Sequence, residues 1–123
     1  MMNIISIDPS KASTGVYIKT DIEVYKSTIS TNGMSENIGY RHISGIIKSS
    51  LDYYNIEVAF LEDYPYKLKE SRSNTVMAEV KGIIKYALYS RNIPIILVPI
   101  STWKALCKGA FPQAGSKTVL SYS

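Results

Sequence analysis

The chain has 123 residues and a formal net charge of +4, from 14 lysine and arginine against 10 aspartate and glutamate residues. Its apolar share of 46% and charged share of 20% exclude an intrinsically disordered chain. The length fits a single domain spanning residues 1–123 and is too short for a second full domain. With one cysteine, Cys107, and one histidine, His42, neither an internal disulfide framework nor a Cys/His zinc site can form.

No apolar run approaches the roughly 18–20 residues of a membrane-spanning helix. The N-terminal residues lack the charged and long apolar regions of a signal peptide. We therefore expect a cytoplasmic protein with no membrane partner. The mildly basic balance permits a polyanionic partner, although a solvated basic face would give the same count.

Three short runs of strand-forming residues open the chain and predict an antiparallel meander. Two helical stripes then alternate with two short apolar runs, which predicts helices crossing over between parallel strands. The expected fold class is α/β, a mixed five-stranded sheet of meander plus parallel strands, flanked by helices. The expected elements are strands at Ile4 to Ile7, Thr14 to Lys19, Ile22 to Ser30, Ile56 to Leu61 and Ile93 to Val98, and helices capped by Ser35 and by Ser73.

The first helix is predicted from a stripe of apolar residues: Ile38, Ile43, Ile46, Ile47, Leu51 and Tyr54. The second is predicted from Val76 to Leu88, after a polar loop from Tyr64 to Arg72. Beyond the last strand we expect a short helix from Ser101 to Cys107. We also expect a final helix that begins at Ser116 and is incomplete at Ser123.

Two carboxylates follow apolar strands. Asp8 comes after the first strand, and Glu62 comes after the strand that ends at Leu61. If these strands are neighbours, both carboxylates emerge at one end of the sheet. The spacing of about 4.8 Å between neighbouring strands would then place them close together. Such a pair repels unless a cation lies between its members, and Mg²⁺ takes oxygen ligands of this kind. The ordinary alternative is that Asp8 starts a turn before Pro9 and Glu62 ends a strand. Asp63 should point to the face opposite Glu62 and be solvated.

The run Ile4 to Ser10, followed by Thr14-Gly15, is similar to the opening of the RuvC-type Holliday junction resolvases of the RNase H-like superfamily. Ala59 to Glu62 resembles the second acidic strand of that family. The helix, strand and lysine-bearing segments that follow in the family resemble Val76 to Gly82, Pro94 to Val98, Trp103-Lys104 and Ser116-Lys117. The resemblance covers nearly the whole chain in order.

The resemblance implies an RNase H-like fold and a metal-dependent endonuclease that cuts DNA four-way junctions in recombination and repair, usually as a homodimer. Asp8 and Glu62 match two of the four catalytic carboxylates of the family and would bind Mg²⁺ or Mn²⁺. Lys104 and Lys117 match basic residues important for DNA handling or catalysis, and Lys117 is our third candidate catalytic residue. A bacterial or phage-infected cell is the implied setting.

The chain departs from the family at two places. Ser10 replaces the usual glycine after Asp-Pro, and no Asp or Glu follows Glu79, whereas the remaining family acids lie on the last helix. This leaves a second reading open, a junction-binding module that lacks catalysis. A third reading keeps the fold but takes structured RNA as substrate.

The loop after Glu62 combines aromatic and basic residues: Tyr64, Tyr66, Lys67, Lys69 and Arg72. Tyrosine rings stack on unpaired bases and lysines bind phosphates, so this loop is a candidate nucleic-acid contact together with Lys104 and Lys117. Tyrosines packed at the core edge beside solvated lysines would explain the loop equally well. Of the 10 tyrosines, Tyr53, Tyr54, Tyr86 and Tyr89 are expected on helices, at a core edge or a dimer face.

Overall fold

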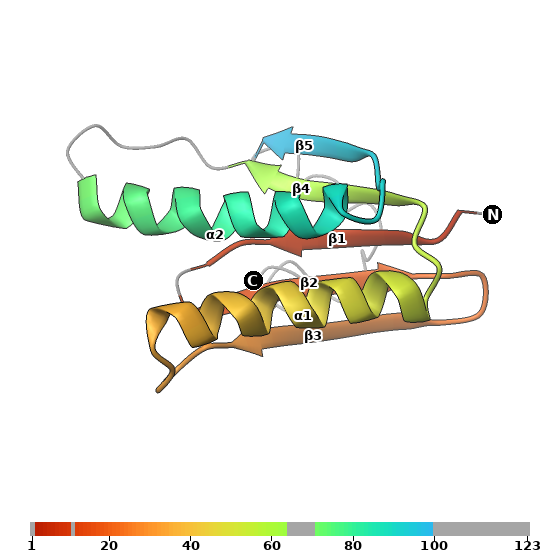
Figure 1. Cartoon of the computed structure of the whole chain (residues 1–123). Helices are drawn as coiled ribbons and strands as arrows, with labels where there is room; N and C mark the ends of the chain where they lie inside the picture. Colours follow the sequence, from red (N-terminus) through yellow and green to blue (C-terminus); the bar gives the residue numbers. More distant parts are fainter. Residues whose placement is uncertain (1, 11, 64–70, 100–123) are drawn as a thin grey trace, which may run out of the picture.

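A mixed sheet organises the chain, in the computed structural model that describes residues 2–10, 12–63 and 71–99, with the backbone alone for 71–74. The elements are β1 (Ile4–Asp8), β2 (Ser13–Lys19), β3 (Val24–Ser30), α1 (Glu36–Tyr53), β4 (Val58–Asp63), α2 (Ser71–Tyr89) and β5 (Ile95–Pro99). The strand order is β3-β2-β1-β4-β5 (Figure 1). The pairs β1–β2 and β2–β3 are antiparallel, whereas β1–β4 and β4–β5 are parallel. The predicted five-stranded sheet, meander plus parallel strands, is confirmed.

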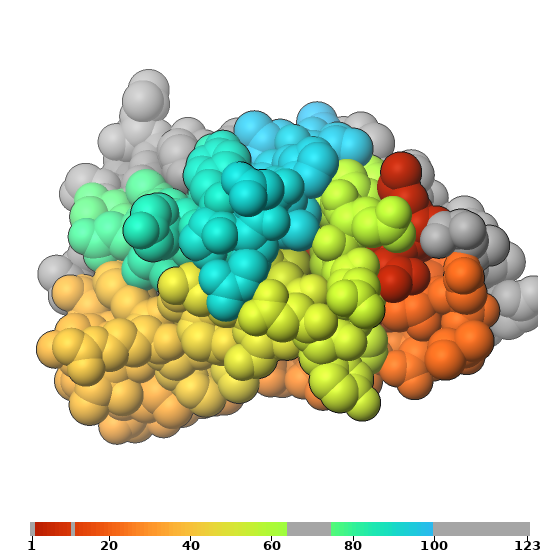
Figure 2. Space-filling model, turned by 45° about the vertical axis from the view of Figure 1, so that its right-hand side comes forward, coloured from red at the N-terminus to blue at the C-terminus, as the bar shows by residue number. Residues whose placement is uncertain are grey.

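Both helices lie on the same face of the sheet (Figure 1), side by side (Figure 2). The core between them and the sheet is built by alternate strand residues, such as Ile5 and Ile7 of β1 and Ala59 and Leu61 of β4. These four side chains are fully buried. We call this side of the sheet the helix face and the other side the far face. Neither described helix is long and apolar enough to span a membrane.

The buried side of α1 follows a four-residue step through Gly39, Ile43, Ile47 and Leu51. Ile38 and Ile46, which we expected on this stripe, are 54% and 41% exposed, so that part of the prediction is wrong. The reason is angular. Each lies one position before a residue of the buried row, about 100° around the helix, and therefore faces away from the sheet.

Several strand boundaries differ from expectation: β1 extends to Asp8, β2 begins at Ser13, and β5 runs over Ile95–Pro99 instead of Ile93 to Val98. β3 begins at Val24 instead of Ile22, because the Thr20 hydroxyl accepts hydrogen bonds from the Ile22 and Glu23 amides and holds them in a turn. β4 begins at Val58 instead of Ile56, since the Ile56 amide donates to the Leu51 carbonyl. β4 continues to Asp63.

Helix α2 begins at Ser71, so the expected cap at Ser73 is wrong, and Arg72 lies in the helix instead of a loop. An apolar stripe shows only where a helix meets the core, and the first turn of α2 is polar in sequence. The elements expected at Ser101 to Cys107 and from Ser116 onward lie outside the described residues.

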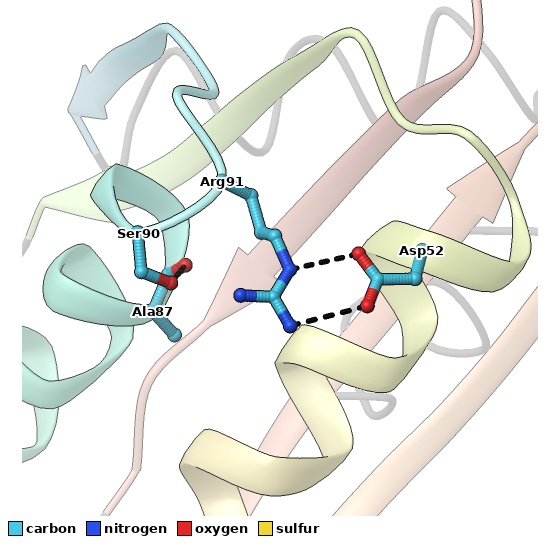
Figure 3. A network of polar contacts seen from close by, with 4 residues as sticks. All are labelled: Asp52, Ala87, Ser90 and Arg91. Atoms are coloured by element: carbon cyan, nitrogen blue, oxygen red, sulfur yellow. Dashed lines mark hydrogen bonds and ion pairs between the residues drawn. The ribbon is translucent and has the colours of Figure 1, made fainter.

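Polar contacts join α1 to α2 and to the turn that follows α2. The Tyr40 hydroxyl of α1 donates a 2.6 Å hydrogen bond to Glu79 of α2. Burial, followed by this bond to a carboxylate, raises the pKa of Tyr40 to about 12. Near the other end, Arg91 donates two hydrogen bonds to Asp52, of 2.8 and 3.1 Å (Figure 3). The hydrogen bond from Arg91 lowers the pKa of Asp52 below its ordinary 3.8.

The packing of α1 predicts opposite results for two neighbouring isoleucines. Ile47→Ala removes a fully buried side chain and should lower the free energy of unfolding by about 2–5 kcal/mol. Ile46→Ala, the matched control, should change it by no more than about 0.5 kcal/mol. Urea unfolding of both variants measures the difference, and equal losses would contradict the described helix orientation.

The Asp52–Arg91 pair predicts a pH-dependent contribution to stability. A carboxyl group whose pKa is lower in the folded state stabilises the fold above its unfolded pKa, and this contribution is lost as the pH falls through the folded pKa. Asp52→Asn should therefore be less stable than the natural chain at pH 7, and the difference should shrink below pH 3.8. Urea unfolding at both pH values tests this, and a difference that grows in acid would disprove it.

Candidate functional site

Asp8 and Glu62 lie at the carboxyl ends of adjacent parallel strands. The register of β1 and β4 pairs Ile4 with Val58 and ends with Ile7 against Leu61. Asp8 and Glu62 each follow that last pair by one residue. Adjacent strands lie about 4.8 Å apart, so the two carboxylates stand beside each other. The expectation that they share one end of the sheet is confirmed, although both are the last or next-to-last residues of their strands instead of following them.

Both carboxylates point to the far face of the sheet. Ile7 and Leu61 belong to the core on the helix face, and successive side chains of a strand alternate between faces. Asp8 is nevertheless only 1% exposed and Glu62 only 2%. Val98 of β5, the register partner of Glu62, is also buried. The acidic pair is therefore set into the molecule, at the end of the two central parallel strands.

Two buried carboxylates at this spacing carry an electrostatic cost. Removal from water disfavours each charge, and each charge disfavours the other. A proton, a basic side chain or a metal cation reduces that cost. The donor set fits Mg²⁺ or Mn²⁺, because both are hard ions that take carboxylate oxygens and Mg²⁺ retains several waters.

Within the described ranges no group of three or more His, Cys, Asp or Glu side chains gathers at one place. The pair formed by Asp8 and Glu62 is thus the metal-ligating set that these residues offer. Further ligands would be water, substrate or residues outside the described ranges.

The other predicted site residues cannot be placed. Arg72 lies in α2, where only the backbone is described. The rest of the set lies outside the described residues: Tyr64, Tyr66, Lys67, Lys69, Lys104 and Lys117. Their assignment to nucleic-acid binding, and that of Lys117 to catalysis, stays a prediction.

Asp63 points to the face opposite Glu62 and its side chain is 41% exposed, so it is partly solvated as expected, but it is also paired. The Lys81 side chain of α2 donates a hydrogen bond to its Oδ1 atom and forms an ion pair with it. Lys81 was missed in the sequence. The available signal was its position in the helix, directly after Val80 and three residues before Ile84. Both of these residues are fully buried, which places Lys81 at the border of the helix's buried side.

Thr14 occupies the position on β2 next to Gly15, the register partner of Asp8. Its side chain is fully buried on the helix face. In the described part of the chain the Thr14 Oγ1 atom has no hydrogen-bond partner. Buried hydroxyl groups are ordinarily paired, so this position carries a cost that valine, of similar shape, would avoid.

No family model matches the sequence, and no curated protein matches it either. Solved structures do match the fold. RuvC of Thermus thermophilus in complex with a Holliday junction substrate has a TM-score of 0.77 at 13% identity, over 93% of this chain and 75% of that one. The yeast mitochondrial Holliday junction resolvase Ydc2 has a TM-score of 0.56 at 12% identity, over 98% of this chain and 60% of that one.

YeaZ from Pseudomonas aeruginosa is a further neighbour, with a TM-score of 0.57 at 12% identity, over 94% of this chain and 51% of that one. At these identities the similarity establishes the fold alone. The fold is RNase H-like, as predicted, and it is shared with RuvC and Ydc2. Because YeaZ shares it too, the fold by itself does not select an activity.

The unpaired hydroxyl predicts that Thr14→Val stabilises the protein. Removal of a buried, unsatisfied hydroxyl should raise the free energy of unfolding by about 1 kcal/mol. Thr14→Ser, which keeps the hydroxyl and loses the methyl group, should instead lower it by about 1 kcal/mol. Chemical denaturation of both variants provides the measurement. A loss of stability in Thr14→Val would mean that the hydroxyl has a partner.

Proposed function

We propose that this protein is a divalent-metal-dependent endodeoxyribonuclease that cuts four-way DNA junctions, that is, a Holliday junction resolvase. The observation that carries the proposal is the buried pair of Asp8 and Glu62 at the ends of β1 and β4. A fold shared with RuvC and Ydc2 adds support. A buried like-charged pair is costly for folding, and such costs concentrate at functional sites.

Asp8 and Glu62 hold Mg²⁺ or Mn²⁺ through their carboxylate oxygens in this proposal. When bound, the metal supplies the means to activate water for phosphodiester hydrolysis and to stabilise the leaving oxygen. The chain contributes fixed ligand positions, because both carboxylates come from central strands whose neighbouring side chains are fully buried. It also limits water around the carboxylates, since both are almost completely buried.

Substrate recognition falls to the basic and aromatic residues of the predicted loop and C-terminal segments. Tyr64 and Tyr66 would stack on unpaired bases at the crossover. The cationic side chains would bind phosphates: Lys67, Lys69, Arg72, Lys104 and Lys117. Lys117 would in addition neutralise charge on the phosphate that is cut.

A homodimer suits a four-way junction, since two copies of one site would cut two strands symmetrically. Tyr53, Tyr86 and Tyr89 are exposed on α1 and α2, which supports a subunit contact on the helix side. A nuclease of this kind would act in the cytoplasm of a bacterial or phage-infected cell.

A second candidate is a junction-binding module without catalysis. It is favoured by the donor count, because the described residues bring no group of three or more metal-ligating side chains together. Such a module would select branched DNA and leave it uncut.

A cleavage assay separates these functions. The natural chain should nick a synthetic four-way junction symmetrically with Mn²⁺, and should not do so with EDTA or on a linear duplex. Asp8→Asn and Glu62→Gln should each lower the rate at least about 100-fold, because each removes one of two metal ligands. Glu23→Gln, in the exposed turn before β3, is the matched control and should cut normally.

The other results are equally informative. Undiminished cutting by Asp8→Asn would refute the assignment of the site. Selective binding without nicks would establish the junction-binding module. Preference for structured RNA over the junction in a competition assay would mean that the site of Asp8 and Glu62 acts on an RNA substrate.

A further inference from the structure

We propose that Asp63 and Lys81 are positioning residues, which hold the carboxyl end of β4 against α2 so that Glu62 faces Asp8 on the opposite side of the sheet. The inference rests on the proposed function of Asp8 and Glu62 as metal ligands. Its basis is the ion pair between Lys81 and Asp63, the residue directly after Glu62.

Beyond Leu61 the sheet pairs β4 on one side only. Pairing with β1 ends at Ile7 and Leu61, one residue before Glu62, and Pro9 follows Asp8 on β1. On the other side, pairing with β5 continues through Glu62 with Val98 and Asp63 with Pro99. A side-chain contact from α2 therefore adds a second restraint on β4 where the carboxylate lies.

The ion pair is well placed to supply that contact. The Lys81 side chain is only 13% exposed, and Val80 beside it and Ile84 one turn later are fully buried in the core. Pairing with a carboxylate offsets the cost of a largely buried lysine charge, so the contact between Lys81 and Asp63 helps to fix both side chains. The Asp63 side chain is 41% exposed, whereas in the Asp52–Arg91 pair both side chains are exposed, at 58% and 38%.

Strand geometry transmits the contact to Glu62. Successive side chains of a strand point to opposite faces, so holding Asp63 against α2 directs Glu62 to the far face. A change of twist or fraying at Asp63 would turn the Glu62 carboxylate away from Asp8. Lys81, on the helix face, acts through Glu62 and is not itself a ligand. Residues that orient metal ligands typically change metal affinity by about 10- to 100-fold.

The test compares Lys81→Met, Lys81→Arg and Arg91→Met, with Mn²⁺ alone as the first probe. In Lys81→Met the dissociation constant for Mn²⁺ should rise about 10- to 100-fold, and kcat on a four-way junction should fall while KM for the junction stays unchanged. Lys81→Arg keeps the charge and should restore both quantities to within about threefold of the natural chain. Arg91→Met removes the exposed pair and should alter neither.

Asp63→Asn is the second variant, in case Lys81→Met does not fold, and should reproduce its loss of Mn²⁺ affinity. Unchanged Mn²⁺ affinity and kcat in a folded Lys81→Met or Asp63→Asn variant would overturn the proposal. So would equal losses in Arg91→Met, which would mark a general effect on stability.

Failure of the proposed function gives a different pattern. If the natural chain binds Mn²⁺ without cutting the junction, the nuclease assignment fails, and the Mn²⁺ affinities still decide the positioning role. If the natural chain binds no Mn²⁺ at all, amide hydrogen exchange at Glu62 and Asp63 tests the positioning role instead. Faster exchange there in Lys81→Met than in Arg91→Met supports the holding of β4, and equal exchange refutes it.

Discussion

The parallel pairing of β1 with β4 is the constraint on which the rest of this structure depends. It joins the N-terminal meander to the β4–α2–β5 unit, and it places the central strands where both flanks are occupied. Because parallel strands end on the same side, the pairing also puts Asp8 beside Glu62. The same contact that completes the core thus brings two buried carboxylates together.

Several features near the strand ends oppose stability. Asp8 and Glu62 are buried like charges, and the Thr14 hydroxyl is buried without a hydrogen-bond partner in the described part of the chain. Pro9, directly after Asp8, has no N–H to donate at the same end. The fully buried apolar residues of the core, Ile5, Ile7 and Leu61 among them, offset these costs. Well-packed strands with buried polar groups at their ends are the arrangement expected of a functional site.

The element order and the meeting of Asp8 and Glu62 were accessible from the sequence, because periodicity reveals strands and helices and right-handed crossovers impose parallel neighbours. Ile38 and Ile46 were misassigned, since a stripe of apolar residues near one face does not show which edge of the stripe is buried. The contact between Lys81 and Asp63 was out of reach, because it depends on the rotation of α2 over β4 and not on spacing along the chain. The first turn of α2 carried no apolar signal to mark it.

The position of β1 in the middle of the sheet has a consequence for the order of assembly during synthesis. β1 and β2 pair as a local hairpin, so they can associate soon after leaving the ribosome. β4 reaches β1 only after α1 has also been made. Until most of the chain has been synthesised, Asp8 can therefore pair with Gly15 of β2 but not lie beside Glu62. The two carboxylates therefore cannot lie side by side before β4 has been made and has paired with β1.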